Sequence, residues 1–269
     1  MPYSAEISRR NPTAIIFLLD QSGSMGEWFS GTIGIRKADG AAKAINAMID
    51  EIIDRCTKDG NVRDYFEIGV IGYGAGEGYV GSILKGIQDF AKVSWLAEHP
   101  LKVIEERPGV KTAIWIEPVS DDGTPMCRAL SLAYEWLNKW IPNHPNAYPP
   151  MVFNITDGQA TDGDPEPLAR KIMKLSTNDG HVLMYNCHIS EVKAEPILYP
   201  SSEGELPPDE FALKLFRMSS ELPEYALSLA MREYKLAKKG SKGFAFNADL
   251  TSLIRFIDIG TRPAREMIK

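Results

Sequence analysis

Five residues whose side-chain oxygen atoms could bind a cation lie where the chain leaves an apolar segment or enters a helix. They are Asp20, Ser22, Ser24, Thr124 and Asp157. A set of carboxylates and hydroxyls without sulfur or imidazole suits a hard cation, and near-octahedral oxygen coordination favours Mg²⁺. If the hydroxyls bind directly and the carboxylates act mainly through water, one coordination position stays open. We expect an acidic side chain of a partner protein to take that position.

The spacing within the segment DQSGS at 20–24 brings its hydroxyls together. Ser22 and Ser24 are two residues apart, so their side chains can converge in a turn, and Gly23 permits the turn to be tight. Taken singly, each of the five residues also has an ordinary explanation, because Asp, Ser and Thr are common in turns and at helix N-caps. The combination in this order, rather than any one residue, indicates a metal site.

The five residues depend on strands that end at a common edge. Residues 14–19 are continuously apolar and stop at Asp20, and residues 151–156 repeat the pattern before Asp157. Such runs are typical of strands covered on both faces, as in a parallel sheet. Ligands of open α/β sheets bind beyond the carboxyl ends of the strands, so both aspartates are expected at one binding edge. Further strands are predicted at 66–73, 79–84, 181–190 and 244–247.

Helical periodicity separates the predicted strands. Apolar residues recur at helical spacing from 38 to 56, and Thr124-Pro125 opens another helix that Pro142 ends. More helices are predicted from about 165 and at 211–217, 225–237 and 250–257. This alternation predicts a doubly wound α/β fold, with a mostly parallel sheet covered by helices on both faces, in a single domain 1–269. Outside this pattern lie inserts at about 26–37 and 85–118, the latter with strand-like pieces at 93–96 and 111–116, and a surface loop at about 191–208.

Three short motifs together resemble a known family. The segments DQSGSM at 20–25, GTPM at 123–126 and ITDG at 155–158 are similar to the metal-ion-dependent adhesion site of von Willebrand factor type A (VWA) domains. Their order and spacing cover residues 14 to about 160, and the later predicted strands are compatible with the family through 257. The resemblance implies a doubly wound sheet, a Mg²⁺ site that in some members holds Mn²⁺ or Ca²⁺, and capture of a Glu or Asp from a partner protein.

The same resemblance implies a role for each residue of the site. Ser22 and Ser24 would bind the metal directly, Thr124 directly or through water, and Asp20 and Asp157 mostly through water. It implies an interaction module rather than an enzyme. Because no signal sequence is present, the intracellular bacterial members are favoured, which are grouped with kinases, phosphatases or AAA+ ATPases in signalling, defence or stress response.

The bulk properties restrict the partner and the compartment. A net charge of -6 and a pI near 5.4 argue against a nucleic-acid partner, which requires clustered Lys and Arg. No segment approaches the ~20 apolar residues of a membrane span, so we expect a cytoplasmic protein without a membrane partner. The three cysteines lack CxxC spacing and indicate neither a disulfide framework nor a zinc site.

Two other interpretations of the site remain open. Asp20 could be the nucleophile of a phosphoaspartyl phosphotransferase or phosphatase, since such enzymes also place an aspartate after an apolar strand. Against this, Ser22 stands where a phosphatase of that kind has its second acid. Alternatively, a bound metal could be purely structural and hold three loops together.

Several residues near the site have less specific interpretations. The pair Trp28-Phe29 is either an exposed recognition patch or buried against the sheet edge. The segment GYGAGEG at 72–78 lacks the GK[ST] ending of a nucleotide-binding loop. His181 and His188 are expected to be structural members of one strand. The nearby aspartates are expected to be solvated rather than to hold a second cation; they are Asp121, Asp122, Asp162 and Asp164.

Overall fold

The fold is organised around one mostly parallel sheet, and the computed structural model describes residues 2–29, 34–190, 194–235 and 237–268. Five strands run parallel in the order β14 (Phe244–Ala248), β12 (Leu183–Ile189), β9 (Met151–Thr156), β1 (Thr13–Asp20) and β4 (Phe66–Ala75). Antiparallel strands flank them: β13 (Ile197–Leu198) on β14, and β5 (Tyr79–Ser82) and β6 (Ala91–Lys92) on β4. The doubly wound α/β class predicted from the sequence is confirmed.

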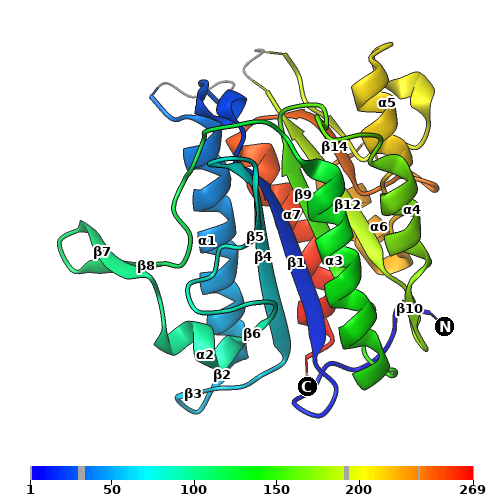
Figure 1. The fold of residues 1–269 in the computed structure, drawn as a ribbon. Coiled ribbons are helices and arrows are strands. Elements are labelled where there is room, and N and C mark those ends of the chain that lie inside the picture. The colour runs from blue at the N-terminus through cyan, green and yellow to red at the C-terminus, as the bar shows by residue number, and fades with distance from the viewer. Residues whose placement is uncertain (1, 30–33, 191–193, 236, 269) are drawn as a thin grey trace.

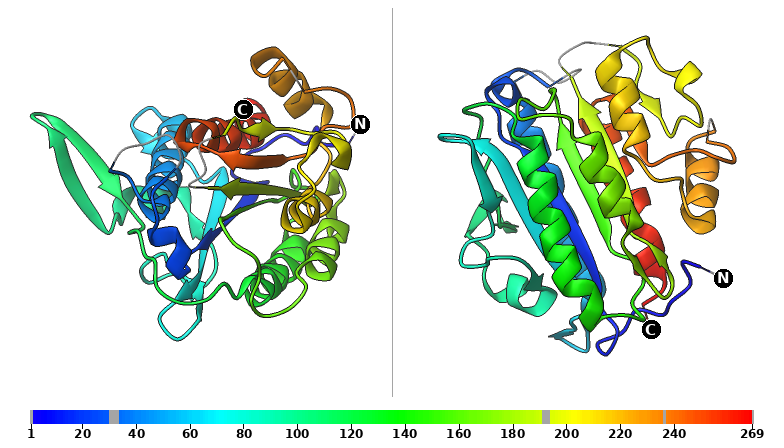
Figure 2. Two further views of the ribbon diagram at one scale, coloured as in Figure 1. Left: turned by 90° about the horizontal axis from the view of Figure 1, so that it is seen from above. Right: turned by 45° about the vertical axis from the view of Figure 1, so that its right-hand side comes forward.

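Helices cover both faces of this sheet (Figures 1 and 2). One layer contains α1 (Lys37–Cys56), α6 (Glu224–Glu233) and α7 (Leu250–Glu266). The other contains α3 (Met126–Trp140), α4 (Glu166–Lys174) and α5 (Glu210–Arg217). Alternation along β1 separates the two cores, because Ile15 and Phe17 join the first whereas Ile16 and Leu18 join the second. This explains why β1 is continuously apolar between Thr13 and Asp20 and is buried throughout.

Short hairpins and 3-10 turns lie outside the central sheet. Two-residue strands form the hairpins β2 (Thr57–Lys58) with β3 (Asn61–Val62) and β10 (Ser176–Thr177) with β11 (Gly180–His181). A longer hairpin, β7 (Lys102–Arg107) with β8 (Val110–Ile114), projects beside α1 (Figure 1). The 3-10 turns are η1 (Gly23–Gly26), η2 (Ile141–Asn143) and η3 (Glu203–Glu205).

The structure corrects the sequence prediction for 93–96, which is not a strand. These residues belong to α2 (Val93–Glu98), where Val93 and Leu96 are buried at a spacing of three. The Asp64 carboxylate accepts a hydrogen bond from the Ser94 N–H and satisfies one of the free donors of the first turn. A short apolar run does not by itself distinguish a strand from a buried helical turn.

The boundaries of three other segments also differ from the prediction. The strand predicted at 181–190 is shorter, and His181 instead belongs to the hairpin strand β11. Within 191–208, residues 191–193 lie outside the described part, but the remainder includes the edge strand β13 and the buried side chain of Tyr199. The last helix continues beyond 257 to Glu266.

The insert predicted at about 26–37 is described only in part, since residues 30–33 lie outside the described ranges. The Trp28-Phe29 pair is divided between the two predicted fates: Trp28 is 61% exposed and Phe29 is buried. Phe29 packs so closely on Gly40 that a side chain at Gly40 would collide with the ring. No membrane-spanning helix is found in the described part of the chain.

Candidate metal centre

The five predicted residues meet where the chain connections from two adjacent strands, β1 and β9, lead to opposite sides of the sheet. From β1 the chain passes through α1 to β4, and from β9 it passes through α4 to β12 on the opposite side. The loops after β1 and β9 therefore diverge from two adjacent strands, and ligands of open α/β sheets bind at such a point. The strand register pairs Leu19 with Ile155, which sets Asp20 next to Thr156.

A chain of hydrogen bonds links four of the five residues. The Asp20 Oδ1 atom accepts from the Ser22 N–H at 2.9 Å, which closes the turn after β1. The Ser22 and Ser24 hydroxyls share a hydrogen bond of 3.2 Å, as their spacing predicts. The Ser24 hydroxyl then donates to Asp157 Oδ1 at 2.8 Å. The side chains of both serines thus lie between the two strand-terminal aspartates.

Thr124 faces the same space from the loop before α3. A Cβ built on Gly158 would lie 3.7 Å from the Thr124 Oγ1 atom and 3.9 Å from the Ser24 Oγ atom. The two hydroxyls therefore converge on a space that Gly158 leaves open. The loop itself is held by reciprocal hydrogen bonds, in which Thr124 N–H donates to the Thr161 hydroxyl and Thr161 N–H donates to the Thr124 carbonyl. Thr124 is 5% exposed.

The glycine-rich segment at 72–78 supports these loops and has no phosphate-binding geometry of its own. It belongs to β4 and the turn into β5, and not to the start of a helix. Gly74 has φ +99°, and a Cβ there would lie 2.3 Å from the Gly123 carbonyl oxygen. At Gly72 the same atom would lie 2.2 Å from Gln21 Oε1. Gly74 thus requires glycine because of its φ and the close backbone of the loop before α3, whereas a side chain at Gly72 would displace the side chains of Gln21 and Ile83.

Lys37 is a central residue of the site that the sequence analysis missed. Its ammonium lies 2.6 Å from Asp157 Oδ2 and 2.8 Å from Glu27 Oε2. The side chains of Lys37 and Asp157 are 4% and 1% exposed, so this ion pair is buried, whereas Glu27 is half-exposed at the rim. Lys37 begins α1, 120 residues before Asp157 in the chain, and no local motif connects the two.

Burial and hydrogen bonds together set the pKa values of Asp20 and Lys37. It raises the pKa of Asp20 to about 6, against hydrogen bonds from Ser22 and Thr156 that lower it, and the nearby Asp157 charge adds to the increase. Burial alone would lower the pKa of Lys37. Hydrogen bonds to Asp157 and Glu27 outweigh that effect, so the Lys37 pKa is raised and its charge is retained.

Asp20 is less accessible than a nucleophile would need to be. It is 0% exposed, and its Oδ2 accepts a hydrogen bond of 2.6 Å from the Thr156 hydroxyl while Oδ1 is held by Ser22. Both carboxylate oxygens are thus directed at groups within the protein. This arrangement suits an anchor beneath the hydroxyls better than attack on an incoming phosphorus atom.

The oxygen donors gathered here are of the kind that hard cations accept. Among the described residues, no cluster of three or more His, Cys, Asp or Glu side chains could hold a metal, so a zinc-type or carboxylate-cage site is not found there. The convergent group consists instead of two carboxylates and three hydroxyls, and the Asp157 Oδ2 atom is paired with the Lys37 ammonium at 2.6 Å. Oxygen ligands of this kind are those that Mg²⁺ accepts together with water.

The four neighbouring aspartates are exposed, as predicted, and three of them also bind groups of the protein. Asp162 accepts hydrogen bonds from the backbone N–H groups of Cys127 and Arg128, so it caps the N-terminus of α3. Asp121 accepts from Gly76 N–H, and Asp164 forms an ion pair of 3.0 Å with Lys214.

His188 lies behind the site on β12 and packs against aromatic rings. It stacks on Phe246 and contacts the Phe211 ring edge. Its Nδ1 atom accepts from Asn247 N–H. Burial lowers the His188 pKa to about 4, so the ring is neutral near pH 7, in line with the structural role predicted for it.

Comparison with known proteins found similar solved structures. No protein-family model and no curated protein matches the sequence. The vWF domain of the type V pili tip protein Mfa5 from Porphyromonas gingivalis is 15% identical, with a TM-score of 0.35, over 56% of this chain and 39% of that chain. A von Willebrand factor type A structure from Catenulispora acidiphila is 16% identical, with a TM-score of 0.37, over 66% of this chain and 33% of that chain. The chain thus spans well under half the length of these two structures.

Proposed function

We propose that this chain is a VWA-type interaction module that binds a divalent cation, with Mg²⁺ as the first candidate, and uses it to capture a carboxylate of a partner protein. The observation that carries the proposal is the convergence of Ser22, Ser24 and Thr124 between Asp20 and Asp157 at the switch point of the sheet. These residues come from three separate loops, so their meeting is a property of the fold.

Each residue has a distinct part in this proposal. The three hydroxyls offer neutral oxygen ligands, and the buried Asp20 holds the Ser22 backbone in place beneath them. A cation bound there would supply an electron-poor centre with a position open to an external oxygen. Asp20, Asp157 and Glu27 with Lys37 sum to two negative charges, which a dication would neutralise. An external carboxylate would then meet the cation at a cluster that carries no net negative charge.

The aspartyl-enzyme alternative has less support. Its nucleophile would be Asp20, which is fully buried and has both oxygens engaged. The raised pKa of Asp20 further reduces the fraction of carboxylate available in the metal-free protein. We therefore place Asp20 as an anchor of the site and not as a catalytic residue.

Metal binding is tested by calorimetric titration of the purified chain with Mg²⁺, Mn²⁺ and Ca²⁺. We expect saturable binding that Ser24→Ala weakens, because this variant removes a ligand and the hydrogen bond to Asp157. Ser252→Ala on α7 is the matched control, since its hydroxyl has no hydrogen bond within the described part of the structure. Equal metal affinity for Ser24→Ala and the control would refute the assignment of the site.

Carboxylate capture is tested separately, by retention of cell proteins on the immobilised chain in Mg²⁺ and in EDTA. Partners retained only with metal, released by acetate and absent from the Ser24→Ala column would support the proposal. A melting temperature that rises with Mg²⁺ but no partner or acetate dependence would instead support a structural metal.

A further inference from the structure

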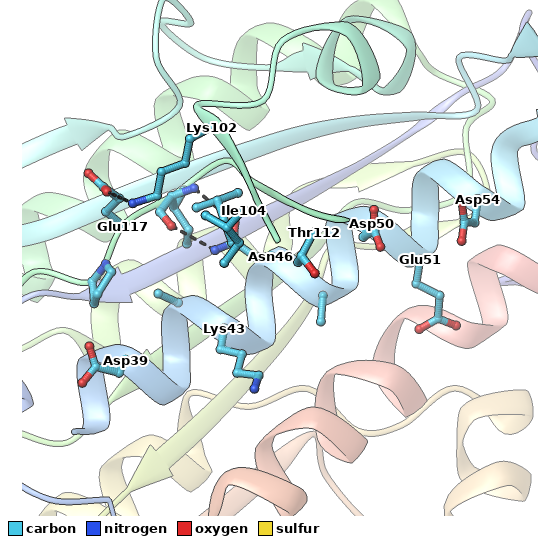
Figure 3. A pocket seen from close by; sticks show the side chains of 15 residues that line it. Asp39, Lys43, Asn46, Asp50, Glu51, Asp54, Lys102, Ile104, Thr112 and Glu117 are labelled. Atoms are coloured by element: carbon cyan, nitrogen blue, oxygen red, sulfur yellow. Dashed lines mark hydrogen bonds and ion pairs between the residues drawn. The ribbon is translucent and has the colours of Figure 1, made fainter. Parts of the chain in front are cut away.

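A groove separates the β7–β8 hairpin from the outer face of α1 (Figure 3). Its volume is about 550 Å³. The strand register pairs Lys102 with Ile114 and Ile104 with Thr112, and these four residues line the groove as one face of the hairpin. On α1 the lining extends from Asp39 to Asp54, which corresponds to about 22 Å of helix.

The base of the hairpin is fixed to the helix by buried hydrogen bonds. The Asn46 Oδ1 atom accepts from the N–H groups of Trp115 and Ile116, and its Nδ2 donates to the Ile116 carbonyl. The Trp115 ring N–H donates to the Leu96 carbonyl. Because Asn46 is buried and all of its polar atoms are engaged, the hairpin is held at a set distance from α1. The groove is thus a built feature of the fold.

The hairpin wall leaves apolar surface uncovered. Ile104 is 37% exposed and lines the groove. The exposed Val103 and Val110 do not line it, and Val103 points to the other face of the hairpin because side chains alternate along a strand. Ile104 and the partly buried Ile114 face the groove and can hold an apolar side chain there.

The charge of the groove selects the partner. Five acidic and two basic residues line it. Glu51 is paired with Arg55 and Arg265, whereas the Asp50 and Asp54 carboxylates have no hydrogen bond or ion pair with any described residue. These two lie one turn apart on α1, where like charges repel. A cation seated beside them would remove that repulsion.

We propose that this groove binds a short basic, amphipathic segment of a partner protein. An apolar side chain of the segment sits against Ile104 and Ile114, and a Lys or Arg reaches Asp50 and Asp54. Lys43 lies nearer the other end of the groove and repels a second basic residue there. The basic residue of the segment is therefore expected at the end that contains Asp50 and Asp54. An extended peptide of about seven residues would span the helix face. The proposal does not depend on the metal site.

The test measures fluorescence anisotropy of a labelled peptide of about eight residues composed of Leu, Ala and Lys, with EDTA present throughout. We expect binding that is weakened about fivefold by Asp50→Asn/Asp54→Asn, as two partly exposed charge pairs imply. Ile104→Ser is expected to weaken it about tenfold through lost apolar contact. The matched control Glu98→Gln/Glu224→Gln removes the same charge outside the groove and should bind like the original chain.

Each other outcome opposes the proposal. Equal loss in the groove variant and the control variant would show attraction to the net charge alone. Tight binding of a peptide with Glu in place of Lys would refute the charge argument, and unchanged peptide affinity in a folded Ile104→Ser variant would refute the apolar contact. Self-association that Ile104→Ser abolishes would assign the groove to a second copy of the chain. Hydrogen exchange with peptide bound should slow at 39–54 and 102–114, and thermal melts verify that all variants fold.

Discussion

Replacement of Lys37 by methionine should lower the stability of the metal-free protein and raise its affinity for a dication. The substitution keeps the length of the side chain but leaves the Asp157 carboxylate, 1% exposed, without its ion-pair partner. Removal of one member of a buried pair typically costs about 3 kcal/mol or more. For a domain of this size, 3 kcal/mol corresponds to a fall in melting temperature of about 6–12 °C in EDTA.

The same substitution predicts the direction of the change in metal affinity. In the native chain a cation at the site must share Asp157 with the Lys37 ammonium, which lies 2.6 Å from the carboxylate. If the metal relieves the whole cost of the unpaired Asp157, the dissociation constant falls by up to ~100-fold. Less complete relief gives a smaller change of the same sign.

Thermal melts in EDTA and in Mg²⁺, with calorimetric titration of the metal, measure both effects. Lys43→Met is the matched control, because Lys43 is exposed on the same helix and forms no ion pair with the described residues. Lys37→Arg retains the charge and should keep most of the stability. An unchanged melting temperature of Lys37→Met in EDTA would refute the buried ion pair. A folded Lys37→Met that binds metal no more tightly than the Lys43→Met control would refute competition between ammonium and metal.

Three further predictions follow from the site. Asp20→Asn should abolish the Mg²⁺-induced shift in melting temperature. The folded-state pKa of Asp20 is raised to about 6, so in EDTA the native chain should lose about 3 kcal/mol of stability as pH rises from about 4 to 6. Asp20→Asn should remove this pH dependence. Thermal melts of both proteins at pH 4–8 measure the difference, and an equal pH slope in the two would contradict the prediction. Gly74 has φ +99° and lies against the Gly123 carbonyl, so Gly74→Ala should destabilise the fold by about 2 kcal/mol or more in urea titrations and weaken metal binding. Wild-type stability of this variant would contradict the close approach of Gly74 and Gly123. Asp162→Ala should cost about 1 kcal/mol in the same titrations by removal of the cap on α3, and no loss would show that the cap is dispensable.

The positions of all five site residues could be predicted because they depend on short-range pattern. Asp20 and Asp157 directly follow apolar strands, and strand ends in a parallel sheet share an edge. The two-residue spacing of Ser22 and Ser24 led to the expected contact of their hydroxyls. Thr124 was placed from the helix that follows it, and the structure brings it to the same space. Their role as metal ligands remains a prediction.

The errors in the predicted fold have physical reasons of the same kind. Residues 93–96 are apolar for too short a distance to display either periodicity, and packing against the remainder of the chain decides their helical state. The segment after β12 was assigned to the surface from its polar composition, yet part of it pairs with β14 and buries Tyr199. Composition describes the average residue of a segment and does not detect a single strand pairing.

The amino-acid sequence was enough to predict the fold class, the sheet edge at which the five residues meet and the oxygen chemistry of their side chains. These follow from periodicity and from the chemistry of oxygen donors, which are local properties. Only the tertiary structure placed the Lys37 ammonium on Asp157, enclosed Asp20 beneath Thr156 and set the β7–β8 hairpin over α1. Each of these contacts joins segments that are distant in the chain. Their geometry depends on how whole helices and strands pack, because ion pairs and clefts between such segments leave no spacing pattern in the sequence.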